Sequence, residues 1–264
     1  MAKIDVLTIR IPALSRDKTI RVLVPDGLSA DERRPVLYMH DGHNLFDAST
    51  SAYGASWNVH RAIADAARRG LRVPFVVGID CPSPKRFDEY SPWVQPDMES
   101  FIPGLGRASF GGEGDAYVDW IADVLKATVD KRYPTFPDST WIAGSSMGGL
   151  ISLHAACRRP ETFRKVGAFS PAVWFAREPL LAELSAAFPH PASCYVDIGT
   201  AESSDGGNPA FPALYLDGAR AIRDALERRG IADLRYVEEE GAPHHESAWE
   251  RRFPGFLDWL ILHE

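Results

Sequence analysis

The chain has 264 residues, of which 45% are hydrophobic, 25% charged and 11% aromatic, and this ordinary composition excludes collagen-like, coiled-coil and wholly disordered chains. Its formal net charge is −7, whereas dedicated nucleic-acid binders carry an excess of basic residues, so we expect no nucleic-acid partner. A chain of this length can form one large core, and we expect a single domain over residues 1–264.

The first elements are two runs of alternating polar and apolar residues, 4–11 and 19–24. Turn-forming residues surround them, namely Pro12 and the Pro25-Asp26-Gly27 stretch. Alternation with a period of two is typical of half-buried strands. The sequence therefore predicts an antiparallel pair of strands at its start.

From residue 36 onward the pattern changes to short apolar runs, most of them followed by a longer stretch with helical periodicity. The runs are residues 36–39, 75–79, 141–143, 166–169, 194–198 and 234–237. Strands that alternate with helices form parallel sheets, with right-handed crossovers that place helices on both faces. We expect an α/β fold with a mostly parallel central sheet and the antiparallel pair at its N-terminal edge.

Three of the helical stripes are well defined. Residues 117–129 and 215–226 repeat apolar side chains at three- and four-residue steps, and Gly230 is placed to cap the second helix. The last stripe covers residues 249–260 and contains Pro254, which should bend or restart the helix. Two segments, 81–114 and 199–212, are rich in Gly and Pro and are expected as irregular loops at the carboxyl edge of the sheet, where open α/β sheets bind ligands.

The cellular compartment is predicted from the cysteines and the N-terminus. Cys81, Cys157 and Cys194 are scattered and odd in number, which favours buried free thiols over disulfides. The N-terminus has no signal-peptide pattern, and the most apolar stretch, residues 166–176, is too short to span a bilayer. We expect a cytoplasmic protein without a membrane partner.

The sharpest motif is Gly-x-Ser-x-Gly, which fits the sequence in one register only: Gly144, Ser146 and Gly148. It follows an apolar strand and opens a helix, the context of a nucleophile elbow, in which a strained turn exposes the serine hydroxyl. Ser145 is excluded because no glycine stands two residues before it. Ser146 is the candidate nucleophile, and the amide of Met147 at the helix start is a candidate oxyanion donor.

The catalytic base should be a histidine late in the chain, since the triad order in such sheets is Ser, acid, His. Of the late histidines, His190 stands between prolines and His263 is penultimate. His244 and His245 lie in the loop between the last strand and the last helix, and spacing alone leaves both open. A metal site formed by these two and Glu246 is disfavoured, because adjacent residues rarely converge on one ion.

The triad acid should leave the strand at residues 194–198. Glu202 and Asp205 on the following loop are the candidates, and spacing leaves both open. Asp197 alternates with apolar neighbours inside the strand, which favours a structural role.

The second oxyanion amide should come from the loop after residues 36–39, where Gly42 permits a turn and leaves the amide of His43 as donor. His40, His43 and Asp47 resemble a metal set, but they cluster on one short loop, so we expect no metal.

A substrate cleft needs lining residues, and aromatic side chains and one arginine are available for it. Trp57, Trp93, Trp174 and Phe175 are candidates, although aromatic residues more often belong to cores. Arg86 could clamp a carboxylate or phenolate of the substrate, or instead pair with Glu89.

Four stretches together resemble the putative-esterase family, the esterase D and enterochelin-esterase-like branch of the α/β-hydrolases, which includes feruloyl esterases and mycolyltransferases. They are residues 38–46 (YMHDGHNLF), Arg86 with residues 89–92 (EYSP), residues 143–149 (AGSSMGG) and residues 241–249 (GAPHHESAW). The resemblance extends over nearly the whole chain from about residue 35. It implies an α/β-hydrolase fold.

The resemblance also implies residue roles. The family pattern Gly-x-x-His-x-Glu-x-x-Trp falls on Gly241, His244, Glu246 and Trp249 and selects His244, and the pattern Gly-Thr-x-Asp/Glu selects Glu202. Relatives often carry Gln and Asn where this chain has histidine at positions 43 and 245.

These residues predict a cofactor-free serine esterase for a small-molecule ester substrate. Ser146, His244 and Glu202 form its triad, His43 and Met147 donate to the oxyanion, and Trp57, Arg86 and Trp174 contact the substrate. The alternatives are an acyltransferase that uses the same triad with an alcohol acceptor, and a binding protein on an inactive hydrolase scaffold.

Overall fold

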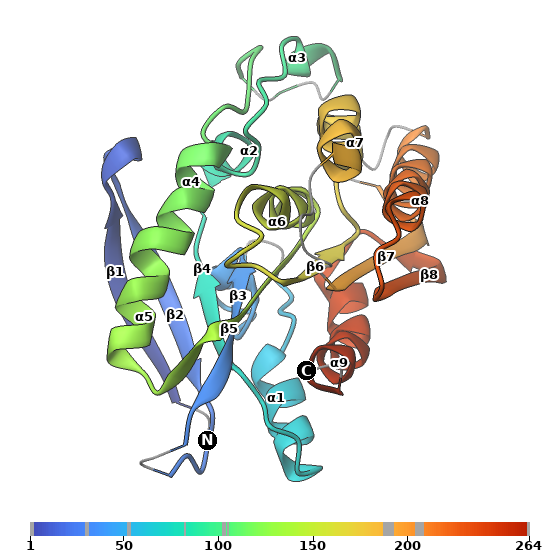
Figure 1. Ribbon diagram of the computed structural model, residues 1–264. Helices are drawn as coiled ribbons and strands as arrows, with labels where there is room; N and C mark the ends of the chain where they lie inside the picture. Colours follow the sequence, from blue (N-terminus) through green and yellow to red (C-terminus); the bar gives the residue numbers. More distant parts are fainter. Residues whose placement is uncertain are drawn as a thin grey trace.

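The computed structural model describes residues 3–29, 32–51, 54–81, 83–101, 104, 106–186, 193–203 and 209–262. Its centre is an eight-stranded sheet in the order β1-β2-β4-β3-β5-β6-β7-β8 (Figure 1). The strands are β1 (Lys3–Ile11), β2 (Arg16–Val24), β3 (Arg34–His40), β4 (Phe75–Ile79), β5 (Thr135–Ser145), β6 (Lys165–Phe169), β7 (Ser193–Ala201) and β8 (Leu234–Pro243).

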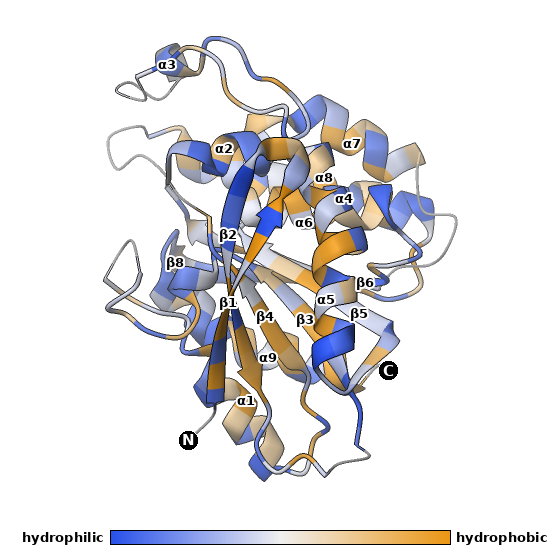
Figure 2. Cartoon of the chain, turned by 90° about the vertical axis from the view of Figure 1, so that its left-hand side faces the viewer, coloured by the Kyte–Doolittle hydropathy of each residue, from blue (hydrophilic) through white to orange (hydrophobic). Residues whose placement is uncertain are grey.

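The directions of the strands confirm the predicted sheet. β1 pairs with β2, and β2 with β4, in antiparallel fashion, whereas all pairs from β4 through β3 to β8 are parallel. The central strand β4 is buried along its whole length and is coloured mainly hydrophobic in Figure 2. A strand that is buried on both faces needs apolar residues throughout, which explains the continuous run in the sequence.

Helices cover both faces of the sheet, as expected. Figure 1 shows α1 and α9 together on one side and the row from α4 to α8 on the other. The helices are η1 (Pro12–Leu14), η2 (Gly42–Asn44), α1 (Val59–Arg68), η3 (Ser83–Lys85), α2 (Arg86–Glu89), α3 (Met98–Phe101), α4 (Gly114–Trp120), η4 (Ile121–Leu125), α5 (Lys126–Arg132), α6 (Met147–Arg158), η5 (Val173–Phe175), α7 (Arg177–Ala186), α8 (Phe211–Arg229) and α9 (Glu246–Leu262).

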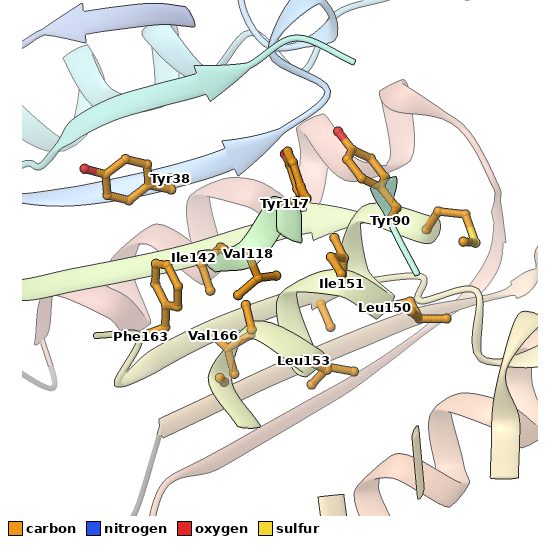
Figure 3. Packing of buried hydrophobic residues seen from close by; sticks show 14 of the residues in the cluster. Tyr38, Tyr90, Tyr117, Val118, Ile142, Leu150, Ile151, Leu153, Phe163 and Val166 are labelled. Atoms are coloured by element: carbon orange, nitrogen blue, oxygen red, sulfur yellow. The ribbon is translucent and has the colours of Figure 1, made fainter. Parts of the chain in front are cut away.

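Two hydrophobic clusters follow from these layers. The first joins α4, α5, α6, α7 and α8 to one face of the sheet, and the second joins α1 and α9 to the other. Figure 3 shows part of the first, where Tyr90 and Tyr117 lie near Leu150 and Ile151 of α6. The three cysteines are buried free thiols within it, as predicted.

The last helix is not restarted at its proline. We expected Pro254 to bend or restart the last helix, but α9 runs from Glu246 to Leu262 with the proline inside it. Pro254 lies on the exposed side of α9, while Phe253, Phe256 and Leu257 are buried against the sheet. Burial of this apolar side holds the helix together across the missing backbone hydrogen bond.

The expected irregular segment over residues 81–114 contains three short helical turns, η3, α2 and α3. A buried ion-pair network fastens it to the N-terminal strands. Glu89 of α2 is fully buried and binds both Arg16 and Lys18 of β2.

No helix among the described residues is long and apolar enough to cross a membrane.

The parallel strands end at a single edge of the sheet, and the candidate residues follow these ends. The predicted oxyanion loop, residues 41–47, follows β3, Ser146 follows β5, Glu202 follows β7 and His244 follows β8. The topology therefore gathers residues from four distant parts of the sequence at one edge.

Candidate active site

Ser146 occupies the sharp turn between β5 and α6. Its backbone has φ 57° and ψ −121°, a conformation that a non-glycine residue rarely adopts. The turn is this tight because β5 and α6 touch: a Cβ on Gly144 would lie 2.8 Å from the carbonyl carbon of Gly148. Glycine at these two positions thus allows the close approach that strains Ser146.

Hydrogen bonds to the end of β6 hold this turn in place. The Ser146 amide donates to the carbonyl of Phe169 at 2.9 Å, and the Ser146 carbonyl accepts the amide of Ala172 at 3.0 Å. The backbone strain at Ser146 is therefore maintained by its surroundings.

The adjacent residues His244 and His245 have different surroundings in the structure. His244 directly follows β8, and its Nδ1 lies 2.6 Å from Glu202 Oε2. Its ring contacts those of Tyr215 and Trp249, at centroid distances of 4.6 Å and 5.0 Å. His245 instead turns outward, with a side chain 42% exposed, and its Nδ1 contacts Ser247.

Glu202 is fully buried just beyond the end of β7. Its Oε1 accepts the Gly199 amide at 2.7 Å and the Ser170 hydroxyl at 2.5 Å. Burial raises the pKa of this carboxyl, but His244, Ser170 and Gly199 together lower it by more, so that the pKa lies below its usual value. Asp205, the other candidate acid, lies outside the described residues, as do His190 and His263.

A tyrosine that sequence reasoning assigned only to a helical stripe contacts the candidate base. The Tyr215 hydroxyl on α8 lies 3.4 Å from His244 Nε2. In this resting arrangement the hydrogen bonds of Ser146 within the described part of the chain are those of its backbone. The period of α8 correctly placed Tyr215 on the buried side but carried no signal for this contact.

The loop after β3 carries His43, whose amide is the predicted oxyanion donor. Asp41 adopts a left-handed conformation with φ 53° and starts the short helix η2, which contains His43. A Cβ on Gly42 would lie 2.6 Å from the Gly78 backbone, so only glycine fits where the loop crosses β4. Within the described residues, the amides of His43 and Met147 donate to no acceptor, which leaves both N–H groups free to bind a ligand.

Arg86 binds the oxyanion loop and does not pair with Glu89, the partner that its position in the sequence suggested. Its guanidinium holds Asp41 in a two-pronged ion pair at 2.8–3.2 Å and also reaches the Ser145 carbonyl at 3.4 Å. Burial raises the pKa of Asp41, but the charge of Arg86 lowers it below its usual value. Arg86 therefore joins the oxyanion loop to the turn that carries Ser146.

The aromatic residues expected to line a cleft differ in exposure. Trp57 is 3% exposed and packs in the core against Phe169 and Trp249. Trp174 is partly exposed and lies beside Phe211 and Tyr215, the tyrosine that contacts His244. Ring contacts therefore connect Trp174 through Tyr215 to His244, the candidate base.

His40, one of the residues that resemble a metal set in the sequence, contacts a tyrosine in the structure. His40 is buried, and its Nδ1 lies 2.9 Å from the Tyr117 hydroxyl. Among the described residues, no group of three His, Cys, Asp or Glu side chains is arranged to hold a metal ion.

A cavity of about 400 Å³ lies beside α1, away from the candidate triad, and Val24, His60 and Ile63 form part of its lining.

Comparisons with known proteins identify the family of the chain. The model of the family described as Putative esterase matches residues 11–260. The uncharacterized protein YbbA of Bacillus subtilis is 24% identical over 249 residues, which cover 92% of each chain. The siderophore triacetylfusarinine C esterase of Aspergillus fumigatus is 30% identical over 144 residues, which are 53% of this chain and 45% of that protein.

Solved structures share the fold over almost the whole chain. The BES protein from Bacillus cereus aligns with a TM-score of 0.78 at 17% identity, covering 99% of this chain and 97% of its own. The siderophore hydrolase EstA from Aspergillus nidulans aligns with a TM-score of 0.73 at 19% identity, covering 99% and 95%. The fold is that of the α/β-hydrolase-like esterases.

Proposed function

The chain belongs to the Putative esterase family of carboxylic ester hydrolases, and we propose that it cleaves its ester through an acyl-enzyme intermediate on Ser146. One observation carries the proposal: Ser146 stands in a strained turn at the same sheet edge as the His244–Glu202 pair. Strained residues of this kind persist where the surrounding structure enforces them, and they cluster at active sites. In a nucleophile elbow such a turn directs the serine hydroxyl toward the site, where a regular strand or helix would not place it.

In the proposed reaction, His244 Nε2 takes the proton of the Ser146 hydroxyl while Oγ attacks the ester carbonyl carbon. The tetrahedral intermediate collapses, and His244 returns the proton to the departing alcohol. Water then repeats the sequence on the acyl-enzyme and releases the acid. Nε2 contacts Tyr215 in the resting structure, and catalytic hydrogen bonds often form only with substrate bound.

Two groups stabilise charge in this scheme. The ionised Glu202 carboxylate faces Nδ1 and stabilises the imidazolium that forms during the reaction. The amides of His43 and Met147 bind the oxyanion, and each donor that is lost costs roughly a hundredfold or more in turnover. The ion pair between Arg86 and Asp41 supports the loop that carries the His43 amide.

The substrate that we propose is a small-molecule carboxylic ester. Trp174 is available to pack against it beside Tyr215. The other two predicted contacts, Trp57 and Arg86, have different partners: Trp57 packs in the core and Arg86 binds Asp41. Two curated relatives, which match about half of this chain, are named siderophore esterases. Siderophore esters are therefore the first natural substrates to assay.

The test is the substitution Ser146→Ala, assayed with p-nitrophenyl acetate. We expect turnover by the folded variant to fall to the uncatalysed background rate, because the nucleophile is absent. A fluorophosphonate probe should add its mass to the wild-type protein and to Ser145→Ala, but not to Ser146→Ala. The neighbouring serine is a matched control for backbone effects. Wild-type turnover in Ser146→Ala would refute the mechanism.

A further inference from the structure

A buried serine that the proposed mechanism does not use lies directly behind the candidate acid. Ser170 is the first residue after β6, is fully buried and has a left-handed backbone with φ 43°. Its Oγ lies 2.9 Å from Trp249 Nε1, 3.0 Å from Arg252 Nη2 and 2.5 Å from Glu202 Oε1. Three elements that are distant in sequence thus meet at one hydroxyl.

The chemistry of these partners fixes the direction of each hydrogen bond. The indole N–H of Trp249 and the guanidinium of Arg252 can only donate, so they occupy the two lone pairs of Ser170 Oγ. The hydroxyl proton of Ser170 must then point to Glu202 Oε1. That oxygen also accepts the Gly199 amide, which leaves it no room for a proton of its own.

The other carboxylate oxygen is left for His244. Because Oε1 accepts two donors, Glu202 Oε2 is the oxygen that faces Nδ1, at 2.6 Å. An ionised carboxylate can only accept, so Nδ1 must carry a proton, and in the neutral imidazole Nε2 is then the unprotonated nitrogen. An unprotonated Nε2 is what a general base requires.

The charge of Arg252 strengthens this arrangement. Its side chain is 5% exposed, and it lies 3.7 Å from Glu202 and 3.3 Å from Asp197, which is also fully buried. Asp197 in turn accepts the Ser170 amide at 3.3 Å and the Tyr195 hydroxyl at 3.1 Å. A hydroxyl that accepts from a cation becomes a better donor, so Ser170 binds the Glu202 carboxylate more firmly.

We infer that Ser170 is a positioning residue, which, with Arg252 and Trp249 behind it, orients the Glu202 carboxylate and thereby sets the tautomer of His244. The inference rests on the proposed triad. It assigns a function to a hydroxyl that never meets the substrate and acts through Glu202 alone.

The first test compares Ser170→Ala with Ser170→Gly. Both remove the hydroxyl, but glycine also removes the strain of a positive φ, so the pair separates the chemistry from the backbone. We expect kcat to fall roughly ten- to a hundredfold in both variants with KM unchanged, because a hydrogen bond to a charged group is lost. Wild-type kcat in Ser170→Gly would overturn the inference.

The second test is a double-mutant cycle with Glu202→Gln. If Ser170 acts through Glu202, the effect of Ser170→Ala should disappear in the Glu202→Gln background, whereas a structural role would reduce kcat by the same factor in both. Additive losses would therefore overturn the inference. ¹⁵N NMR adds a second readout, with His244→Gln to assign the signals: Nδ1 should be protonated in the wild-type protein and should lose this preference in whichever Ser170 variant folds. An unchanged tautomer in that variant would overturn the inference.

These outcomes are separable from a failure of the proposed function. If Ser146→Ala keeps its activity, the triad itself is wrong. If Ser146→Ala is inactive while the Ser170 variants behave like the wild-type protein, the triad stands and only the role of Ser170 falls.

Discussion

Each oxygen of the Glu202 carboxylate has its own partners. Oε1 faces Gly199 and Ser170, whereas Oε2 faces His244. This division makes the consequence of an amide at position 202 predictable, because an amide has one oxygen that accepts and one nitrogen that donates.

The substitution Glu202→Gln should place the amide oxygen at the Gly199 and Ser170 donors and the NH₂ group toward His244 Nδ1. Nδ1 would then have to accept and Nε2 would carry the proton, so that the base is blocked. We expect kcat to fall by about 10⁴-fold, measured with p-nitrophenyl acetate.

The exposed Glu240 on β8 provides a matched control, since Glu240→Gln removes the same charge outside the candidate site. We expect its kcat to equal that of the wild-type protein. A Glu202→Gln enzyme with comparable kcat would mean that Glu202 does not govern His244.

At the scale of elements, the contact between β5 and the start of α6 determines the geometry at Ser146. A Cβ on Gly144 would meet backbone atoms of Gly148 at 2.8 Å, which cannot give way without moving α6. A Cβ on Gly148 would instead lie 3.1 Å from the Cβ of His40. The two glycines of one motif therefore differ in how much they tolerate.

We expect Gly144→Ala to lower the free energy of unfolding by about 1–3 kcal/mol and to reduce kcat, because the strand and the helix must separate. Gly148→Ala should lower both quantities less. Urea unfolding and steady-state kinetics of the two variants measure this order. A larger loss in Gly148→Ala than in Gly144→Ala would show that the contact between Gly148 and His40, and not the contact between Gly144 and Gly148, determines the geometry of the turn.

Sequence patterns predict the elements best where burial is uniform. β4 is buried on both faces, and its apolar run predicts its bounds to the residue. β8 lies at the sheet edge, and its apolar run stops at Val237 although pairing with β7 continues to Pro243. β5 likewise begins six residues before the predicted run, across a register shift against β3. Backbone pairing extends both strands where side-chain patterns give no signal.

The candidate site shows the same division. The motif around Ser146 and the loops after β3, β7 and β8 could be located from the sequence, because strand ends of a parallel sheet meet at one edge. The contacts of Ser170, Tyr215 and Arg252 could not, because they join residues that are 29 to 82 positions apart. Nor could the pairing of Arg86 with Asp41, 45 positions away, in place of the nearby Glu89.

At the scale of the whole molecule, the buried histidine under the oxyanion loop links stability to pH. His40 is 2% exposed at the end of β3, and burial lowers its pKa from 6.5 to about 3. The neighbouring Asp41 opposes this shift, whereas Arg86 and Lys18 add to it. The folded protein thus holds His40 neutral under conditions in which the unfolded chain binds a proton.

The sign follows from proton linkage. Below pH 6.5 His40 becomes protonated in the unfolded chain, whereas in the folded protein it stays neutral down to about pH 3. The stability that the neutral histidine allows near pH 7 is therefore lost as the pH falls through this window. The loss amounts to about 1.4 kcal/mol per pH unit for one proton.

His40→Phe should remove this one-proton dependence, because phenylalanine fills the buried position without titrating. We expect the free energy of unfolding of the variant to fall less steeply than that of the wild-type protein between pH 6 and about pH 4. Urea unfolding followed by the fluorescence of the seven tryptophans measures both slopes. Tyr117→Phe is the matched control: it removes the hydroxyl that His40 contacts but leaves the imidazole buried, so the wild-type slope should persist. Parallel curves for His40→Phe and the wild-type protein would show that His40 is protonated in the folded state, and that burial at the end of β3 does not exclude its charge.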